Sequence, residues 1–346
     1  MPPRHPDIAA ALGQLRPALA RVRETRGARL SLLVACSGGA DSTALLGLLA
    51  LIRDGDRLEL TVGNIDHGLR PDSAAEATHV ATLAAGLGLP LRSTRLTLAV
   101  GPGLPARARD ARRAALQTMA GTGVAIALGH TRTDQAETVL MHATRGAGLD
   151  GLAAMPPWDP PWLRPLLGLG RATTRALCEQ LGLAFVDDPS NLDLRHPRVR
   201  VREQLLPGLR QDNPRVESAL AALAEQAADA EAALLAWAVA EETRRRLGPD
   251  HWTAEGMAGL PRAVRTRVLR RICELGGVDM GALGHSAIAS VDRALCGREA
   301  AVNAPDAGPA SPARAPRTWD LRPGLRLRLD RGGLRLGPAG GPSEGS

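Results

Sequence analysis

The sequence predicts an α/β protein: a parallel sheet with helices on both faces, then a smaller helical domain and a C-terminal β-hairpin. Three features of the 346 residues favour this fold class. Short apolar runs alternate with helical segments between residues 30 and 182, as in parallel sheets with helical crossovers. Residues 214–247 are rich in Ala, Leu and Glu, which favours a long helix. Leu and Arg alternate over 325–329 and again over 334–336, which predicts the hairpin.

The strands are predicted from apolar runs that are too short for helices. They are expected at 30–35, 58–65, 89–96 and 123–129, with a further short strand at 185–186. The Pro-rich stretch 155–165 is interpreted as a bend.

The helices are predicted from apolar residues that recur at helical spacing. A first helix at 7–24 would bury one face, formed by Ile8, Leu12, Leu15, Leu19 and Val22. Further helices are expected at 73–87, 105–120, 133–144 and 171–182. Thr133 or Asp134 is expected to cap helix 133–144.

The chain is expected to fold as two domains with a tail. Residues 1–206 form the sheet domain, and residues 207–300 form the helical domain, which contains a long helix at 214–247. Residues 301–318 are an Ala/Pro stretch expected to be disordered. Residues 319–346 form the hairpin and tail.

The composition points to a polyanionic partner. The formal net charge is +7, and all 43 Lys+Arg positions are Arg, so the chain contains no Lys. A basic balance favours nucleic acid, although an Arg-biased chain also has a solvated basic surface. The four cysteines have no CxxC spacing, which argues against zinc ribbons and cysteine-ligated iron–sulfur clusters. No apolar run reaches the length of a membrane span, so a cytoplasmic location without a membrane partner is expected.

A glycine turn between the first strand and its helix is the strongest motif. Its residues are Ser37, Gly38, Gly39, Ala40, Asp41 and Ser42. Glycines allow a sharp turn and a close approach to an anion, and the N–H groups of the next helix attract phosphate. Asp41 is placed to ligate Mg²⁺ beside those phosphates. Without a Lys, the turn differs from a Walker A loop. An ordinary capped turn is the alternative.

Polar side chains follow two other strands at the same edge of the predicted sheet. Asp66, His67 and Arg70 follow strand 58–65, and His130 follows strand 123–129. Ligands of parallel sheets bind beyond these carboxyl ends. Asp134 and Glu137 lie three residues apart on the next helix, either as acid–base groups or as acids that complement the helix dipole.

Two Arg-rich stretches are candidates for phosphate contacts. One is the helix that carries Arg107, Arg109, Arg112 and Arg113, and the other carries Arg195, Arg198, Arg200 and Arg202. Either stretch could contact RNA phosphates or remain a solvated surface.

These segments together resemble a known family. The SGGxDS turn at 37–42 matches the ATP pyrophosphatase (PP-loop) superfamily, which is adenine nucleotide alpha hydrolase-like in fold. The chain is similar to the tRNA(Ile)-lysidine synthetases through Asp66–Glu76, Ala106–Leu116, Leu128–Met155, Asp188–Asn191 and Arg198–Leu206. The similarity departs at Arg113 and Val199, where the family usually has Tyr and Asn.

The resemblance implies a ligase. ATP and Mg²⁺ bind at the turn, and the wobble cytidine of a tRNA(Ile) with a CAU anticodon is adenylated at its C2 oxygen. L-lysine then displaces AMP. The implied catalytic and substrate residues are Asp66, His67, Arg70, His130, Asp134 and Glu137. The implied tRNA or lysine contacts are Arg109, Arg112, Arg145, Arg198 and Arg202. The sequence leaves the oligomeric state open, and a homodimer is one candidate.

Three other functions stay open at this point. The first is another PP-loop enzyme, such as a tRNA thiolase, although those acting on cytidine often carry CxxC pairs. The second is a ligase acting on a small molecule. The third is a module that binds nucleotide or tRNA without turnover.

Overall fold

The computed structural model describes residues 5–66, 73–97, 101, 103–187, 193–279, 283, 285–303 and 315–338. The chain divides into two compact units, Met1–Ala228 and Asp229–Ser346. Their boundary falls within the long helix α10 (Val216–Arg245), which confirms the helix predicted at 214–247. The domain boundary predicted at residues 206 and 207 stays a prediction.

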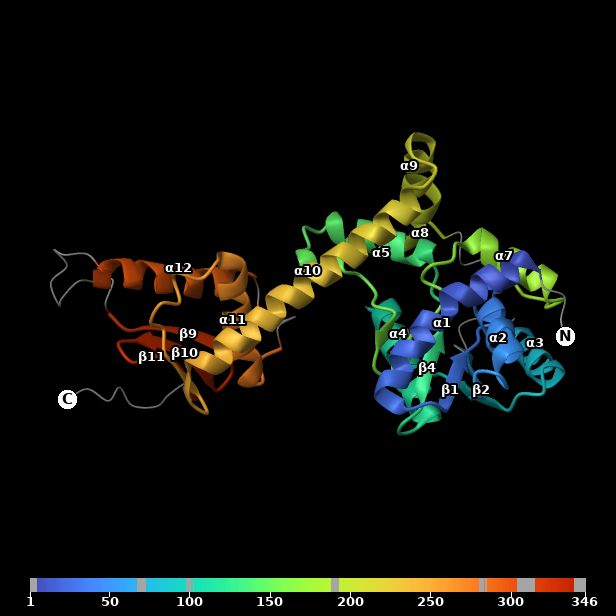
Figure 1. Ribbon diagram of the computed structural model, residues 1–346, viewed down its shortest axis with the longest axis horizontal. Coiled ribbons are helices and arrows are strands. Elements are labelled where there is room, and N and C mark those ends of the chain that lie inside the picture. The colour runs from blue at the N-terminus through green and yellow to red at the C-terminus, as the bar shows by residue number, and fades with distance from the viewer. Residues whose placement is uncertain are drawn as a thin grey trace. The chain divides into compact units, whose positions relative to one another are not determined.

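A six-stranded sheet forms the centre of the first unit (Figure 1), with the strand order β3-β2-β1-β4-β6-β5. Its strands are β1 (Leu30–Ala35), β2 (Leu58–Asp66), β3 (Leu91–Arg95), β4 (Ala125–Leu128), β5 (Trp158–Asp159) and β6 (Trp162–Leu163). β1 pairs in parallel with both β2 and β4, and only the short β5 runs antiparallel to its neighbour. The four long predicted strands and the parallel sheet are confirmed.

The first unit also contains a series of helices, some of which cover the two faces of this sheet while others pack on those helices. They are α1 (Pro6–Arg26), α2 (Ala40–Ile52), α3 (Ser73–Gly86), α4 (Leu104–Ala120), α5 (Arg132–Ala143), α6 (Leu149–Leu152), α7 (Arg171–Gln180), α8 (Pro197–Arg200) and α9 (Leu206–Asp212), with a π-helical turn η2 (Val201–Leu205) before α9.

Alternate side chains of β1 lie on opposite faces of the sheet, because successive residues of a strand point to opposite sides. Leu32 and Val34 pack in one core with α1, α2 and α7. Leu33 and Ala35 pack in another core, with Leu116 of α4. The loop after β1 therefore lies between two helical layers, and β1 has β2 on one side and β4 on the other. This is the point where strand order reverses and ligands of such sheets bind.

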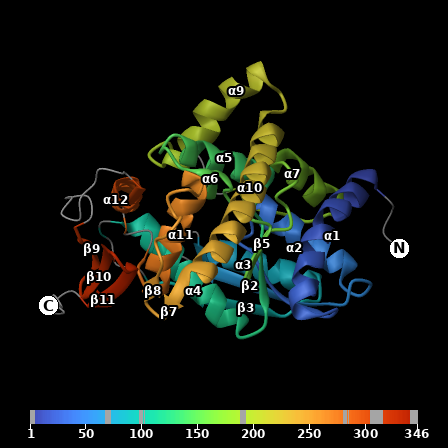
Figure 2. The same ribbon diagram turned by 60° about the vertical axis from the view of Figure 1, so that its left-hand side comes forward.

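The second unit has its own sheet and core. Its elements are β7 (Arg246–Gly248), β8 (His251–Trp252), α11 (Arg262–Leu275), α12 (His285–Asn303), β9 (Arg317–Arg322), β10 (Leu325–Asp330) and β11 (Gly333–Pro338). The five strands form one antiparallel sheet in the order β7-β8-β11-β10-β9 (Figure 2). The predicted hairpin is β10–β11, and it buries Leu327, Leu329 and Leu334 against α11 and α12.

A buried ion pair joins the two helices of this unit. Arg265 Nε donates to Asp292 Oδ1 at 2.5 Å, and Arg265 Nη1 donates to the carbonyls of Ala258 and Leu260 at 2.9 and 2.7 Å. Because its hydrogen bonds are satisfied, this guanidinium serves the core of the unit rather than a surface for RNA.

Several local predictions were wrong. Stretch 155–165 is not a simple bend, since β5 and β6 extend the sheet there. The described residues form no strand at 185–186; instead, the Val186 N–H donates to the Gly38 carbonyl at 2.9 Å. The ends of the predicted disordered stretch 301–318 are ordered, because α12 continues to Asn303 and β9 begins at Arg317. Residues 304–314 lie outside the described part.

Candidate nucleotide-binding and catalytic site

The turn after β1 is closed by its own serines. Gly38 has a φ of +86°, a conformation that favours glycine, and Gly39 precedes the first residue of α2. The Ser42 hydroxyl accepts from the Ser37 N–H at 3.2 Å and donates to the Gly39 carbonyl at 3.0 Å. The turn is thereby fixed with the amide N–H groups of the first turn of α2 available to an anion.

Gly129 allows β4 and α2 to approach closely. A Cβ atom at position 129 would lie 3.0 Å from three backbone atoms of Asp41 and Ser42. Only glycine fits that contact without a shift of backbone. The end of β4 and the phosphate turn are therefore packed together, and His130 follows directly.

Asp41 is held by two residues of α7. Thr174 Oγ1 donates to Asp41 Oδ1 at 2.5 Å, and Arg171 Nε lies 3.5 Å from Asp41 Oδ2. Burial raises the pKa of Asp41, while the Thr174 hydrogen bond and the Arg171 charge oppose that rise. The carboxylate is thus oriented at the start of α2, beside the predicted phosphate site.

The same Arg171 connects Asp41 to the acidic pair of α5. Arg171 Nη2 donates to Asp134 Oδ1 at 3.1 Å. The Asp134 Oδ2 atom accepts from both the N–H and the hydroxyl of Thr131 at 2.8 Å. Thr131 is therefore the residue before α5, and the prediction that Thr133 or Asp134 caps this helix was wrong. Asp134 instead completes a capping box from inside the first turn.

Glu137 lies one turn further along α5, fully buried, between two arginines. Arg198 Nε donates to Glu137 Oε2 at 2.6 Å, and Arg202 Nε donates to Glu137 Oε1 at 2.5 Å. Arg198 Nη2 also donates to Asp134 Oδ1 at 2.9 Å. Burial alone would raise the pKa of Asp134, but the charges of Arg171 and Arg198 outweigh it and lower that pKa to about 2. Asp134 is anionic at neutral pH.

His130 is a neutral side chain beside these charges. Burial lowers its pKa to about 4, and the charges of Arg198, Arg164 and Arg112 act in the same direction, against Asp134. Its Nδ1 atom has no hydrogen-bond partner within the described chain. At pH 7 the imidazole is uncharged, and one buried ring nitrogen lacks a hydrogen-bond partner within the described chain.

Several predicted residues take other positions. Asp66 ends β2, and its carboxylate lies 3.5 Å from Arg95 Nε. His67 and Arg70, together with the segment 188–192, lie outside the described residues. Arg109 and Arg112 lie on α4, and Arg112 approaches His130 closely enough to lower its pKa. Arg198 and Arg202 are bound to Glu137, so their contact with lysine or RNA stays a prediction.

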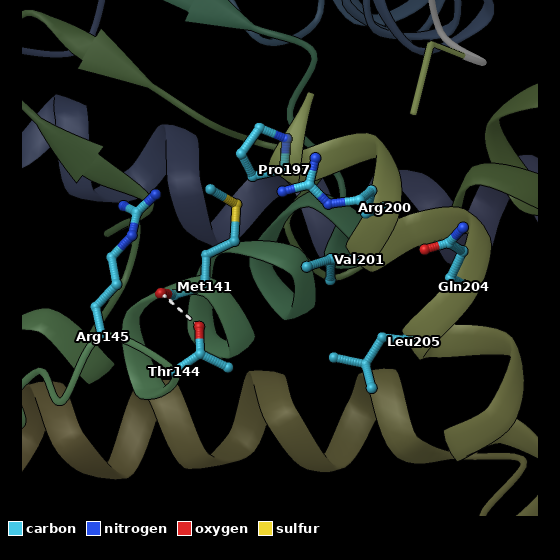
Figure 3. A pocket seen from close by; sticks show the side chains of 8 residues that line it. All are labelled: Met141, Thr144, Arg145, Pro197, Arg200, Val201, Gln204 and Leu205. Carbon is cyan, nitrogen blue, oxygen red and sulfur yellow. Dashed lines mark hydrogen bonds between the residues drawn. The ribbon is translucent and has the colours of Figure 1, made fainter. Parts of the chain in front are cut away.

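Arg145 lines a cavity of about 420 Å³ behind this cluster (Figure 3). The walls come from the end of α5 and from α8 and η2: Met141, Thr144, Arg145, Pro197, Arg200, Val201, Gln204 and Leu205. Figure 3 shows Arg145 and Arg200 on opposite sides, with Met141 and Val201 between them. Of the described residues, two guanidinium groups and no carboxylate line this cavity, a composition suited to an anionic ligand with an apolar part.

Arg171 and Thr174 were missed by the sequence interpretation. Helix 171–182 was predicted, yet nothing in its pattern distinguishes Arg171 from the other arginines of an Arg-rich chain. The sequence predicts Gly129 only as the end of a buried strand. Its role depends on α2, which is 87 positions earlier in the chain at Ser42.

The residues present can hold a nucleotide and one metal contact. Gly38 and the start of α2 form a cradle for phosphates. Asp41 offers a single carboxylate, which suits Mg²⁺ because that ion typically uses one or two carboxylates together with substrate phosphates and water. No group of three His, Cys, Asp or Glu side chains within the described chain could hold a metal by itself. No helix among those residues is long and apolar enough to span a membrane.

Comparisons with known proteins agree with this geometry. A family model described as a PP-loop domain matches residues 14–209. The tRNA(Ile)-lysidine synthase of Thermobifida fusca is 41% identical over 285 residues, which cover 81% of this chain and 87% of that protein. The synthase of Salinispora arenicola is also 41% identical, over 84% of this chain and 90% of its own. The synthase of Streptomyces coelicolor is 40% identical, and the match covers 79% of this chain and 80% of that protein.

A solved structure shows the same fold. The U34-tRNA thiolase of Methanococcus maripaludis superposes with a TM-score of 0.54 and covers 64% of this chain and 80% of its own, at 17% identity. That identity supports the fold alone. The relatives at about 40% identity, which match this chain over most of their length, are decisive: the chain belongs to the tRNA(Ile)-lysidine synthase family of PP-loop proteins.

Proposed function

We propose that this protein ligates L-lysine to C2 of the wobble cytidine of a tRNA(Ile) with a CAU anticodon, converting ATP to AMP and pyrophosphate. Family membership supports the proposal. The observation that carries it is the position of Arg171, which lies 3.5 Å from Asp41 and 3.1 Å from Asp134. The phosphate turn and the acidic pair of α5 are thereby parts of one site, as a reaction between a nucleotide and a second substrate requires.

The first step forms an adenylated base. The C2 oxygen of the cytidine attacks the α-phosphate of ATP, and the bond from that phosphorus to pyrophosphate breaks. The N–H groups at the start of α2 would hold the departing pyrophosphate. Mg²⁺, held by Asp41, would neutralise phosphate charge. Asp66, His67 and Arg70 would provide further contacts to the nucleotide or the base.

The second step forms the new C–N bond. The ε-amine of lysine attacks C2, the C2–oxygen bond breaks, and AMP leaves. The nitrogen must lose a proton as it reacts. Asp134 and Glu137 already accept hydrogen bonds from arginines, whereas the neutral His130 has an unpartnered Nδ1 atom. We place the proton acceptor at His130.

Lysine recognition requires the ion pairs around Glu137 to exchange partners. We propose that Glu137 binds an ammonium of lysine, while Arg198 or Arg202 turns to its carboxylate. The buried cluster supplies both charges, and the carboxylate–guanidinium pairs seen in the structure keep them satisfied before lysine enters.

The tRNA would be held by arginines that carry no ion pair. Arg109, Arg112 and Arg145 have no carboxylate partner in the described chain, and the cavity that Arg145 lines begins at Met141, one helical turn beyond Glu137 on α5. We therefore place an anticodon-loop phosphate at Arg145.

Transfer of labelled lysine is the decisive experiment. The protein is incubated with radiolabelled L-lysine, ATP and tRNA(Ile), and the tRNA is digested to nucleosides. The expected result is label in one modified cytidine with one AMP released per lysine. Binding of ATP and tRNA without label in the RNA would contradict a ligase and indicate a binding module.

Two further inferences accompany this function. A cytoplasmic location is supported by the buried, unbridged thiols of Cys36, Cys178 and Cys273 and by the need for ATP and tRNA.

A homodimer is tested by sedimentation of the protein at micromolar concentration, where a single species of twice the 36.2 kDa chain mass is expected.

A further inference from the structure

Arg113 lies over the ring of a buried tryptophan. Its guanidinium carbon is 4.5 Å from the centre of the Trp162 ring. Trp162 is only 3% exposed and packs with Leu116 of α4 and Ile126 of β4. Arg113 itself is exposed. The ring therefore supports one face of the guanidinium, and the group presents a planar, cationic surface to solvent.

Two other arginine–ring stacks in the described chain include a carboxylate, which the Arg113 stack lacks, as does that of Arg26 over Trp158. Arg175 lies over Phe185 at 4.7 Å and pairs with Asp187 at 2.7 Å. Arg246 lies over Trp252 at 5.4 Å and pairs with Glu242 at 3.0 Å. Among the described residues, Arg113 has no ion pair or hydrogen-bond partner. Within that part of the chain, Trp162 is the contact that orients it, and the side chain is exposed.

The neighbours of Arg113 are also cationic. Arg109 precedes it by four residues on α4, so the two share a helix face, where like charges repel. Burial and the charge of Arg109 lower the pKa of Arg112. Burial likewise lowers the pKa of Arg164, with Arg113 contributing and Asp159 opposing. Asp159 is 3.9 Å from Arg164, and among the described residues no other carboxylate pairs with this group. The group is therefore complementary to an anion.

We propose that Arg113, supported by Trp162, is a stacking platform for an unpaired nucleobase of the substrate RNA, with Arg109 and Arg112 binding the adjoining phosphate. Unpaired RNA bases stack on guanidinium planes as well as on aromatic rings. A chain with no Tyr and one Phe has few exposed rings to offer, and an arginine fixed on a buried Trp supplies the missing plane. This proposal rests on the proposed function in that the RNA is taken as its substrate.

The position of the platform favours RNA over ATP as the occupant. The helix α2, which follows the phosphate turn, packs on the face of the sheet that includes Leu32 and Val34. Trp162 and α4 pack on the opposite face with Leu33 and Ala35. A base on Arg113 would thus lie across the sheet from α2, while Arg112 extends the cationic surface toward His130.

The test compares three substitutions at one position. Arg113→Tyr keeps a planar group without charge, Arg113→Lys keeps the charge without the plane, and Arg113→Ala removes both. Affinity for an anticodon stem-loop RNA is measured without ATP or lysine, together with KM for RNA and for ATP in lysine transfer. Arg26→Ala is the matched control, because Arg26 also lies over a ring, Trp158 at 5.2 Å, but precedes β1 at the amino end of the sheet.

A stacked base predicts a specific order of effects. Arg113→Ala and Arg113→Lys are expected to weaken RNA binding about tenfold, within the range for loss of one base stack, while Arg113→Tyr stays within about threefold of the unaltered protein. KM for ATP and the melting temperature should be unchanged in all three, and Arg26→Ala should bind RNA normally.

Other outcomes overturn the platform. Equal losses in the Tyr and Ala variants would show that only the charge matters, and normal RNA binding by Arg113→Ala would show that no base lies there. A rise in KM for ATP would assign the group to the nucleotide instead. Because stem-loop binding is measured without chemistry, failure of lysine transfer in the unaltered protein would reject the proposed function separately.

Discussion

Arg202 binds the buried carboxylate of Glu137 with two donors: its Nε lies 2.5 Å from Oε1 and its Nη2 lies 3.0 Å from Oε2. The pair fixes the start of η2 against the second turn of α5. It places a negative and a positive charge side by side at a fully buried position, which is the chemical requirement for a substrate that is itself a zwitterion.

Glu137→Gln is expected to abolish lysine transfer and to lower the free energy of unfolding by about 3 kcal/mol, because removing one partner leaves buried charge uncompensated. Urea unfolding and label transfer measure the two effects. Asp320→Asn is the control, since the Asp320–Arg326 pair is exposed and is expected to change stability by less than about 1 kcal/mol. Similar losses in both variants would contradict a special role for the buried pair.

Asp41→Ala is expected to remove ATP–pyrophosphate exchange and leave the fold intact, since the side chain is one of the groups that orient the phosphates. Thr174→Val keeps the carboxylate but removes the hydrogen bond that positions it, and a smaller loss of roughly tenfold in the exchange rate is expected. Exchange at the unaltered rate in Asp41→Ala would contradict the assignment of this loop.

Gly129→Ala is expected to reduce exchange and stability together, because the added Cβ would meet the backbone of Asp41 and Ser42 at 3.0 Å. The cost should lie at roughly 1–3 kcal/mol, as for overpacked sites. Gly13→Ala is the matched control: a Cβ there meets nothing within 4 Å, and within helix α1 it should stabilise the protein by up to about 1 kcal/mol.

Acid should destabilise the protein through His130. Its pKa is about 4 in the folded chain, against 6.5 for an unperturbed histidine. Between these values the unfolded chain binds the proton first, so this contribution is complete above pH 6.5 and is lost as the pH falls toward 4. In His130→Gln, the free energy of unfolding should fall by up to about 3 kcal/mol less over this pH range than in the unaltered protein. A decline of unchanged steepness in His130→Gln would contradict this role of His130.

RNA affinity should fall steeply with added salt, because arginine–phosphate contacts release counterions. Arg145→Gln is expected to weaken binding of tRNA(Ile) and to reduce the slope of log affinity against log salt by about one. Arg244→Gln serves as the control, since Arg244 already pairs with Glu241. An unchanged slope in Arg145→Gln would place the phosphate elsewhere.

The elements with strong local signals could be predicted from the sequence. The strand at 30–35, the SGGADS turn and helix α2 each have a pattern of their own, and the polar residues at the ends of β2 and β4 follow from the parallel sheet. The carboxylate–arginine network could not be predicted, because Arg171, Arg198 and Arg202 resemble every other arginine of the chain until the fold brings them to Asp134 and Glu137.

The short strands depended on tertiary contacts as well. β5 and β6 have two residues each and contain no extended apolar run, so their identity comes from pairing with β4 and with each other. The prediction of a strand at 185–186 was wrong because a tertiary contact takes the place of strand pairing. The two apolar residues use a backbone donor to hold the phosphate turn at Gly38 instead of joining the sheet.

The absence of Lys from the chain has a practical consequence for its chemistry. Every basic side chain is a guanidinium or an imidazole, so the protein has no ε-amine that could be acylated, form an imine or be modified as lysine residues are. Apart from the α-amino group, a primary amine detected in a complex with this protein belongs to a ligand. Amine-reactive crosslinkers and amine-selective isotope labels would therefore report directly on an amino-acid substrate, with no background from the protein's own side chains.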